Sequence, residues 1–147
     1  MDLWRLCRRP YADLTGEGAR QFGGRWNRPG RAMVYLAEHP ALAAMEVRVH
    51  LDLPFDLLPA DYVMMRVGLP DRYVTDLAEI PADPAMAGET WLLETRSAAL
   101  RVPSILVPHA WNVLLNTAHR DATRAKVLTV EPFGFDPRLW HPLSAEG

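Results

Sequence analysis

The alternation of apolar and polar positions along the chain predicts three main strands. They cover residues 3–7, 32–37 and 61–69. In the second of these, Met33 and Tyr35 share one face and Val34 and Leu36 share the other, as the two-residue period of a strand requires. Shorter strands are expected over residues 74–77, 100–107 and 125–130. A proline within residues 100–107 makes that segment a strand or a strand edge.

Apolar positions three and four apart predict two helices, one starting at Pro40 and one over residues 90–99. Pro40 fits the first turn, where its missing N–H is tolerated. The residues at helical spacing after it are Leu42, Met45, Glu46 and Val49. This spacing puts Glu46 on or beside the buried face of the helix, which is an unusual place for a carboxylate.

The remaining segments predict connections and a closing cluster. Residues 10–24 and 81–88 are expected to be loops, residues 27–30 a turn, and residues 111–115 a loop or a helical turn. The core anchors expected near the end of the chain are Phe133, Phe135 and Trp140. Strands and helices alternate without a regular βαβ rhythm, so we expect an α+β fold with a mixed, mostly antiparallel central sheet and flanking helices.

Composition narrows the class of protein. A chain of 147 residues favours a single domain over 1–147, and its 49% hydrophobic and 23% charged residues are usual for a folded domain. The net charge of −2 disfavours direct binding to nucleic acid through a basic field. No apolar run reaches the roughly 20 residues of a membrane span. Cys7 is the only cysteine and the N-terminus lacks a signal peptide, so we expect a cytoplasmic protein.

The common cofactor and metal motifs are absent. Residues 16–21 lack the third glycine of the dinucleotide fingerprint. Glu46 and His50 are four residues apart, but two ligands alone make a weak metal site, and no cysteine pair or His-Glu-x-x-His sequence is present. No nucleophile elbow of a serine hydrolase can be found. We therefore expect no bound metal.

Arg25, Tyr35 and Glu46 are the residues that suggest a ligand. A cation, a flat aromatic ring and a carboxylate lie close together in the sequence, and a hydrophobic core requires none of them. They suit a ligand with a phosphate, a planar base and a hydroxylated sugar, and a nicotinamide dinucleotide has all three. Each residue also has a structural alternative. Arg25 could lie on the surface, Tyr35 in the core, and Glu46 could pair with Arg48, His50 or another arginine.

The chain resembles the RES-domain toxins of bacterial toxin–antitoxin pairs. The similar motifs run in family order across nearly the whole chain. They are Leu3-Trp4-Arg5, Gly16-Glu17-Gly18, Gly23-Gly24-Arg25-Trp26-Asn27, Val34-Tyr35, Glu46-Val47 with His50-Leu51, Val102-Pro103-Ser104, Val107-Pro108, Asn112 with Leu114-Leu115-Asn116, and residues 135–139. One departure lies at residues 116–121, where the family usually has two prolines and this chain has none.

The resemblance implies a single compact ADP-ribosyltransferase-like RES domain that takes NAD as its substrate and cleaves the nicotinamide–ribose bond. It implies Glu46, Arg25 and Ser104 as catalytic residues. Glu46 would stabilise the cationic ribose, and Ser104 would donate or accept a hydrogen bond there without acting as a nucleophile. Arg25 would also bind NAD at its pyrophosphate or the adjoining ribose.

Three further expectations concern binding residues and the fold. Tyr35 would stack on nicotinamide, with its hydroxyl on a polar partner. Asn112 and Asn116 would bind NAD or pin their own loop. Arg5 and Asp136 would serve the fold as a pair.

The resemblance also implies partners and leaves the acceptor open. A cognate antitoxin carrying a DNA-binding domain is expected to block the active site. The leading hypothesis is a toxin that depletes NAD by phosphorolysis or hydrolysis. The alternative is a mono-ADP-ribosyltransferase that modifies a specific cellular protein. A third hypothesis, an inactive binding module, ranks last because Arg25, Tyr35, Glu46 and Ser104 are all present.

Overall fold

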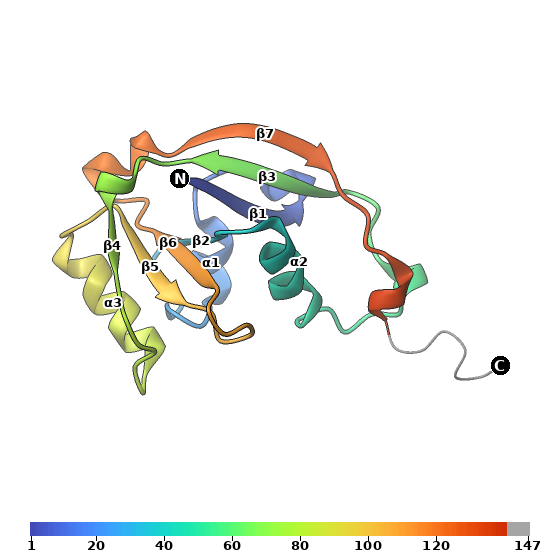
Figure 1. Cartoon of the computed structure of the whole chain (residues 1–147), viewed down its shortest axis with the longest axis horizontal. Helices are drawn as coiled ribbons and strands as arrows, with labels where there is room; N and C mark the ends of the chain where they lie inside the picture. The colour runs from blue at the N-terminus through green and yellow to red at the C-terminus, as the bar shows by residue number, and fades with distance from the viewer. Residues whose placement is uncertain (141–147) are drawn as a thin grey trace.

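Seven strands form one sheet in the computed structural model, which describes residues 1–140 (Figure 1). The strands are β1 (Asp2–Arg8), β2 (Val34–Ala37), β3 (Tyr62–Gly68), β4 (Val74–Asp76), β5 (Ala99–Pro103), β6 (Trp111–Leu115) and β7 (Lys126–Pro132). Their order across the sheet is β4-β5-β6-β2-β1-β3-β7. Every neighbouring pair is antiparallel except β4 and β5, which are parallel. The prediction of an α+β fold with a mostly antiparallel sheet is confirmed.

Three α-helices accompany the sheet in the described part of the chain. They are α1 (Glu17–Phe22), α2 (Pro40–Arg48) and α3 (Pro84–Glu94). In α2 and α3 a proline occupies the first turn, as predicted for Pro40, and the preceding side chain caps the helix. In Figure 1, α2 lies beneath β1 and β2, and α3 lies beside β4 and β5. None of the helices within residues 1–140 is long and apolar enough to cross a membrane.

Three boundary predictions were wrong, for local reasons. Residues 17–22 form α1 instead of a loop. The helix expected over 90–99 begins earlier, because Asp83 caps its N-terminus and Pro84 fits its first turn. It ends at Glu94 because Thr95 adopts a left-handed backbone conformation with φ of 52°.

Residues 111–115 were expected to be a loop or helical turn, and that prediction was wrong. They form β6, which lies between β2 and β5 near the middle of the sheet. Val113, Leu114 and Leu115 are almost completely buried. A strand that is covered on both faces has no polar alternation, so a short apolar run of this kind does not reveal its secondary structure.

The packing of α2 determines where Glu46 lies. Leu42 and Ala43 are buried, whereas Met45 and Val49 are 44% and 52% exposed, contrary to the expected buried face. The packed side of the helix runs through Leu42, Ala43 and Val47. Glu46 is next to this side and half-buried, which agrees with the prediction for the carboxylate.

The end of the described chain packs against α2 and the segment that follows it. Phe135 and Trp140 are buried and Phe133 packs beside them, so all three predicted anchors are confirmed. The Arg48 guanidinium lies 4.0 Å from the centre of the Trp140 ring and donates to the Leu139 carbonyl at 3.0 Å. These contacts hold the C-terminal end of α2 against the last described residues.

Candidate functional site

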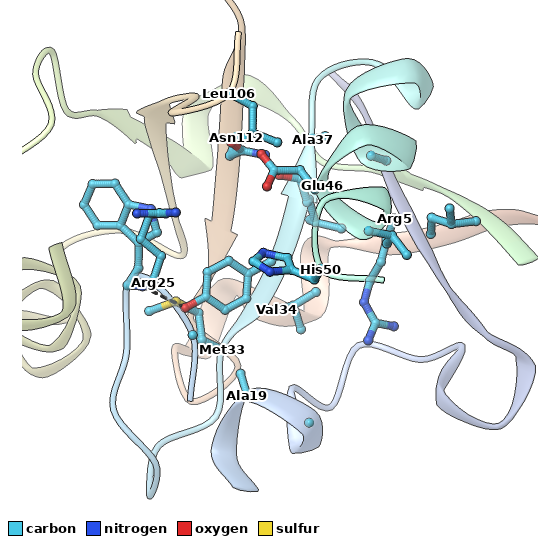
Figure 2. A pocket seen from close by; sticks show the side chains of 18 of the residues that line it. Arg5, Ala19, Arg25, Met33, Val34, Ala37, Glu46, His50, Leu106 and Asn112 are labelled. Carbon is cyan, nitrogen blue, oxygen red and sulfur yellow. Dashed lines mark hydrogen bonds between the residues drawn. The ribbon is translucent and has the colours of Figure 1, made fainter. Parts of the chain in front are cut away.

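A pocket of about 870 Å³ lies among β1, β2, α1 and α2 (Figure 2). Its volume is in the range of small-molecule sites. Arg25, Tyr35, Glu46 and Asn112 all line it, so the structure brings four of the six predicted site residues together. Figure 2 shows Arg25 on one side, with Glu46 across the pocket next to Asn112 and His50 below Glu46.

A tight hairpin presents Arg25. Gly24 and Asn27 form an isolated β-bridge, with the Gly24 N–H donating to the Asn27 carbonyl at 2.9 Å. Gly23 precedes it with φ of +73°, a conformation that favours glycine. At the tip, Trp26 is only 3% exposed and packs into the core with Trp91 and Leu92. The buried indole therefore anchors the hairpin and leaves the neighbouring Arg25 at the pocket.

Asn27 and Tyr35 connect this hairpin to the sheet. The Asn27 amide nitrogen donates to three backbone carbonyls, those of Ala19, Arg28 and Arg31. The Tyr35 hydroxyl donates to Asn27 Oδ1 at 2.5 Å and accepts from the Trp26 N–H at 3.0 Å. The expected polar partner of the Tyr35 hydroxyl is thus the protein's own loop, while the ring lines the pocket.

Burial keeps the Tyr35 hydroxyl protonated. It raises the pKa of Tyr35 to about 12, against the smaller opposing effects of the Trp26 and Asn27 hydrogen bonds and of Arg25. The phenol therefore stays neutral and able to donate at physiological pH. A Cβ on Gly24 would lie 2.6 Å from the Tyr35 hydroxyl, so the motif needs glycine at this position.

Arg25 is exposed at the pocket, and its side chain forms no hydrogen bond or ion pair with another residue in 1–140. The other residues of the motif have structural roles, since the glycines allow the turn and the buried Trp26 and Asn27 anchor it. An unpaired guanidinium facing a pocket is suited to a phosphate or carboxylate of a ligand.

Glu46 faces the pocket from α2 and forms no salt bridge with any residue in 1–140. Burial raises the pKa of its carboxyl group, and the Asn112 side chain and the charges of His50 and Arg25 lower it. The structural alternative of a pair with Arg48 is not found, because the Arg48 guanidinium donates to the carbonyls of Leu139 and Leu51. A half-buried carboxylate near a free arginine can stabilise positive charge on a bound ligand.

Ser104 and Asn116 are the two predicted site residues that do not line the pocket. Ser104 is 8% exposed, and its Oγ accepts from the N–H groups of Leu106 and Val107, both at 3.1 Å. It therefore shapes the turn that carries Leu106 into the pocket wall. Asn116 is 2% exposed and donates to the Leu92 carbonyl at 3.2 Å, so its contacts support the pinning role.

The predicted pairing of Arg5 with Asp136 was wrong. Arg5 Nη1 donates to the carbonyls of Tyr11 and Asp13 at 2.6 and 3.2 Å. Asp136 accepts from Arg138, whose hydrogen bonds lower the pKa of the carboxyl group to about 2. Short-range partners thus satisfy both groups.

Arg5 and His50 are pocket residues that the sequence alone did not place in the site. The pairing pattern of β1 and the position of His50 two residues after α2 bring them there, and neither is visible as a local motif. Within residues 1–140, no three His, Cys, Asp or Glu side chains are grouped so that they could hold a metal ion.

Comparison with known proteins identifies relatives of this architecture. Residues 2–136 match the RES domain family. The Prs ADP-ribosylating toxin of Sphingobium is 37% identical, over 93% of this chain and 95% of that protein. The NAD(+) phosphorylase MbcT of Mycobacterium tuberculosis is 30% identical, over 90% of this chain and 81% of that protein.

Among solved structures, the crystal structure of the M. tuberculosis MbcT–MbcA toxin–antitoxin complex contains a chain with the same fold. The TM-score is 0.75 at 20% identity, covering 90% of this chain and 84% of that one. The match over nearly the whole chain and the extent of the sequence identity lead to one conclusion. The chain belongs to the RES domain family.

Proposed function

We propose that this protein is a toxin that binds NAD in the pocket and cleaves its nicotinamide–ribose bond. The observation that carries the proposal is the arrangement of Arg25 and Glu46 in one pocket of about 870 Å³. Arg25 is a cation free to bind the pyrophosphate or the adjoining ribose. Glu46 is a carboxylate in the wall of the same pocket as the Tyr35 ring, so a sugar bound in this pocket could contact both.

Cleavage of the nicotinamide–ribose bond requires few catalytic groups besides Arg25 and Glu46. Nicotinamide leaves as a neutral molecule with the bonding pair, so no strong general acid is needed. Positive charge then develops on the ribose, as in glycoside cleavage. The Glu46 carboxylate stabilises that charge and accepts a hydrogen bond from a ribose hydroxyl. Ser104 supports the reaction by holding the turn at Leu106, and NAD is consumed as a substrate without a metal.

The acceptor of ADP-ribose distinguishes two versions of this function. Phosphorolysis or hydrolysis depletes NAD, and the similarity to the NAD(+) phosphorylase MbcT supports this version. The alternative is transfer to a specific cellular protein, which the similarity to the Prs ADP-ribosylating toxin supports. Both versions use the same pocket and differ only in the nucleophile that attacks the ribose.

We also propose that a cognate antitoxin covers the mouth of this pocket and carries a DNA-binding domain, and that the toxin itself does not bind nucleic acid. The structural relative is a toxin–antitoxin complex, which supports a partner of this kind. The reducing environment expected for a chain with one cysteine supports action in the cytoplasm.

Incubating the purified protein with NAD tests the proposal directly. NAD loss and the products are measured by mass spectrometry with and without inorganic phosphate, and labelled NAD in a cell extract reports transfer to protein. We expect free nicotinamide in every active sample, with ADP-ribose phosphate only when phosphate is present. Removing the carboxylate by Glu46→Ala should lower kcat at least about 100-fold, the usual cost of losing one electrostatic stabiliser.

Glu79→Ala is the matched control, because Glu79 is exposed and lies outside the pocket. This variant should cleave NAD at the wild-type rate. Survival of NAD with the wild-type protein, both alone and in the extract, would contradict the proposed function. Full activity of Glu46→Ala would contradict the role of Glu46.

A further inference from the structure

Asn112 occupies the place where the central strands meet α2. It lies on β6, opposite Ala37 of β2, and lines the pocket. Its amide nitrogen Nδ2 donates to the carbonyl of Leu36 at 3.3 Å, across a separation of 76 residues. The contact ties the side chain to the backbone of the sheet at the floor of the site.

The Leu36 carbonyl determines which way the amide faces. If the amide were flipped, Oδ1 would approach a carbonyl oxygen, and two acceptors would repel each other. The NH₂ group has two hydrogens, and only one is used on Leu36. Figure 2 shows Asn112 next to Glu46. The second N–H of the amide is therefore available to the Glu46 carboxylate, and the Asn112 side chain lowers the pKa of that carboxyl group.

We propose that Asn112 is a positioning residue that holds the Glu46 carboxylate in its working orientation, and that it acts on NAD cleavage through Glu46 without binding NAD itself. This inference rests on the proposed function of Glu46. It replaces the expectation that Asn112 contacts NAD, because one amide hydrogen binds the backbone of β2 and the other is available to the Glu46 carboxylate beside it (Figure 2).

An amide is well suited to this task. The other groups that face Glu46 are His50 and Arg25, and both are cationic when protonated. Arg25 is needed for the ligand, and His50 is exposed to solvent. Asn112 has no charge to lose. Its side chain opposes the effect of burial on the pKa of the Glu46 carboxyl group.

The substitution Asn112→Leu keeps the size of the side chain and removes both donors. Two measurements test the proposal: the pH dependence of NAD cleavage, and the titration of the Glu46 carboxyl group by ¹³C NMR without NAD. We expect kcat about 10- to 100-fold lower, the range for one hydrogen bond to a charged group. The KM for NAD should stay within about twofold. The pKa of Glu46 and the acidic limb of the pH profile should both move to higher pH.

Two further variants separate positioning from general damage to the fold. Asn112→Ser is too short to reach Glu46 and serves if the leucine variant does not fold, with the same expected shifts. Asn116→Ser removes a buried amide at the end of the same chain segment, outside the pocket, and should leave the pKa of Glu46 unchanged.

The outcomes distinguish this inference from the proposed function. A raised KM with an unchanged Glu46 titration would overturn it, because that result indicates a direct contact between Asn112 and NAD. An equal shift in the Asn116 variant would also overturn it, since the shift would then reflect loosening of the fold. If the wild-type protein consumes no NAD, the proposed function fails, while the NMR titration still reports whether Asn112 holds Glu46.

Discussion

At the scale of single residues, the site is built around a carboxylate, Glu46, whose ionised form is destabilised by burial in the folded protein. Burial raises the pKa of Glu46, which means that the ionised group is less favourable in the folded protein than in the unfolded chain. Only Asn112, His50 and Arg25 oppose this effect among the groups around it in the described structure. Such a cost is typical of a functional position and atypical of one that serves stability.

Replacing Glu46 by glutamine should therefore stabilise the protein in one pH range. A carboxyl group whose pKa is raised on folding weakens the folded state once the pH rises above the ordinary value of 4.5. We expect Glu46→Gln to melt at a higher temperature than wild type at pH 7, with the difference disappearing well below pH 4.5. Calorimetry across this range provides the measurement, with Glu79→Gln as the exposed control. A lower melting temperature for Glu46→Gln at pH 7 would show that its charged neighbours outweigh burial.

The hydroxyl of Tyr35 is a second residue with a separable role. Tyr35→Phe keeps the ring in the pocket but leaves the Trp26 N–H and Asn27 Oδ1 without their shared partner. We expect a loss of about 1–3 kcal/mol in the free energy of unfolding. We also expect a several-fold higher KM for NAD, because the hairpin holding Arg25 loosens. Urea unfolding and steady-state kinetics measure the two effects.

Tyr11→Phe is the control for that substitution, since Tyr11 is 59% exposed and its side chain is outside the pocket. It should change neither quantity. If Tyr35→Phe also unfolds at the wild-type urea concentration, the hydroxyl does not carry the hairpin as we infer.

At the scale of elements, α3 acts as the support for the arginine hairpin. Gly88 is buried within α3, and a Cβ at this position would lie 1.9 Å from the Trp26 carbonyl oxygen. Arg28 reaches the same helix, with its N–H donating to Glu89 at 2.8 Å. The hairpin therefore packs against α3, while the Tyr35 hydroxyl connects it to β2. Neither contact could be inferred from the motif around Arg25.

Gly88→Ala tests this support. Alanine favours a helix over glycine by up to about 1 kcal/mol, so an isolated helix would gain stability. Here the new methyl group meets backbone, and the hairpin must shift. We expect a net loss of stability in thermal unfolding and a lower kcat/KM for NAD. Gly18→Ala in α1 is the matched control for stability, because nothing lies within 4 Å of its Cβ position. Equal gains in both variants would refute the close packing of Gly88.

At the scale of the whole molecule, the pocket exists only because distant segments converge. The hairpin provides Arg25, β2 provides Tyr35, α2 provides Glu46 and β6 provides Asn112. The last described residues then fix the end of α2 through Arg48. Segments spread from β1 to the Trp140 cluster thus contribute to the position of the site, which agrees with a family match that extends over residues 2–136.

The sequence by itself determined the main strands, the start of α2, and the roles open to Arg25, Tyr35 and Glu46. These depend on local spacing and on residue types that a core does not need, and both can be recognised along the chain. It also carried the ordered motifs by which the family is recognised.

Only the tertiary structure decided that residues 111–115 are a central strand, that Ser104 and Asn116 bond to nearby backbone, and that Asn112 faces Glu46. The physical reason is that the role of a polar side chain depends on the group with which it forms a hydrogen bond. The partner of Asn112 on β2 lies 76 residues away, and no local pattern reports such a hydrogen bond.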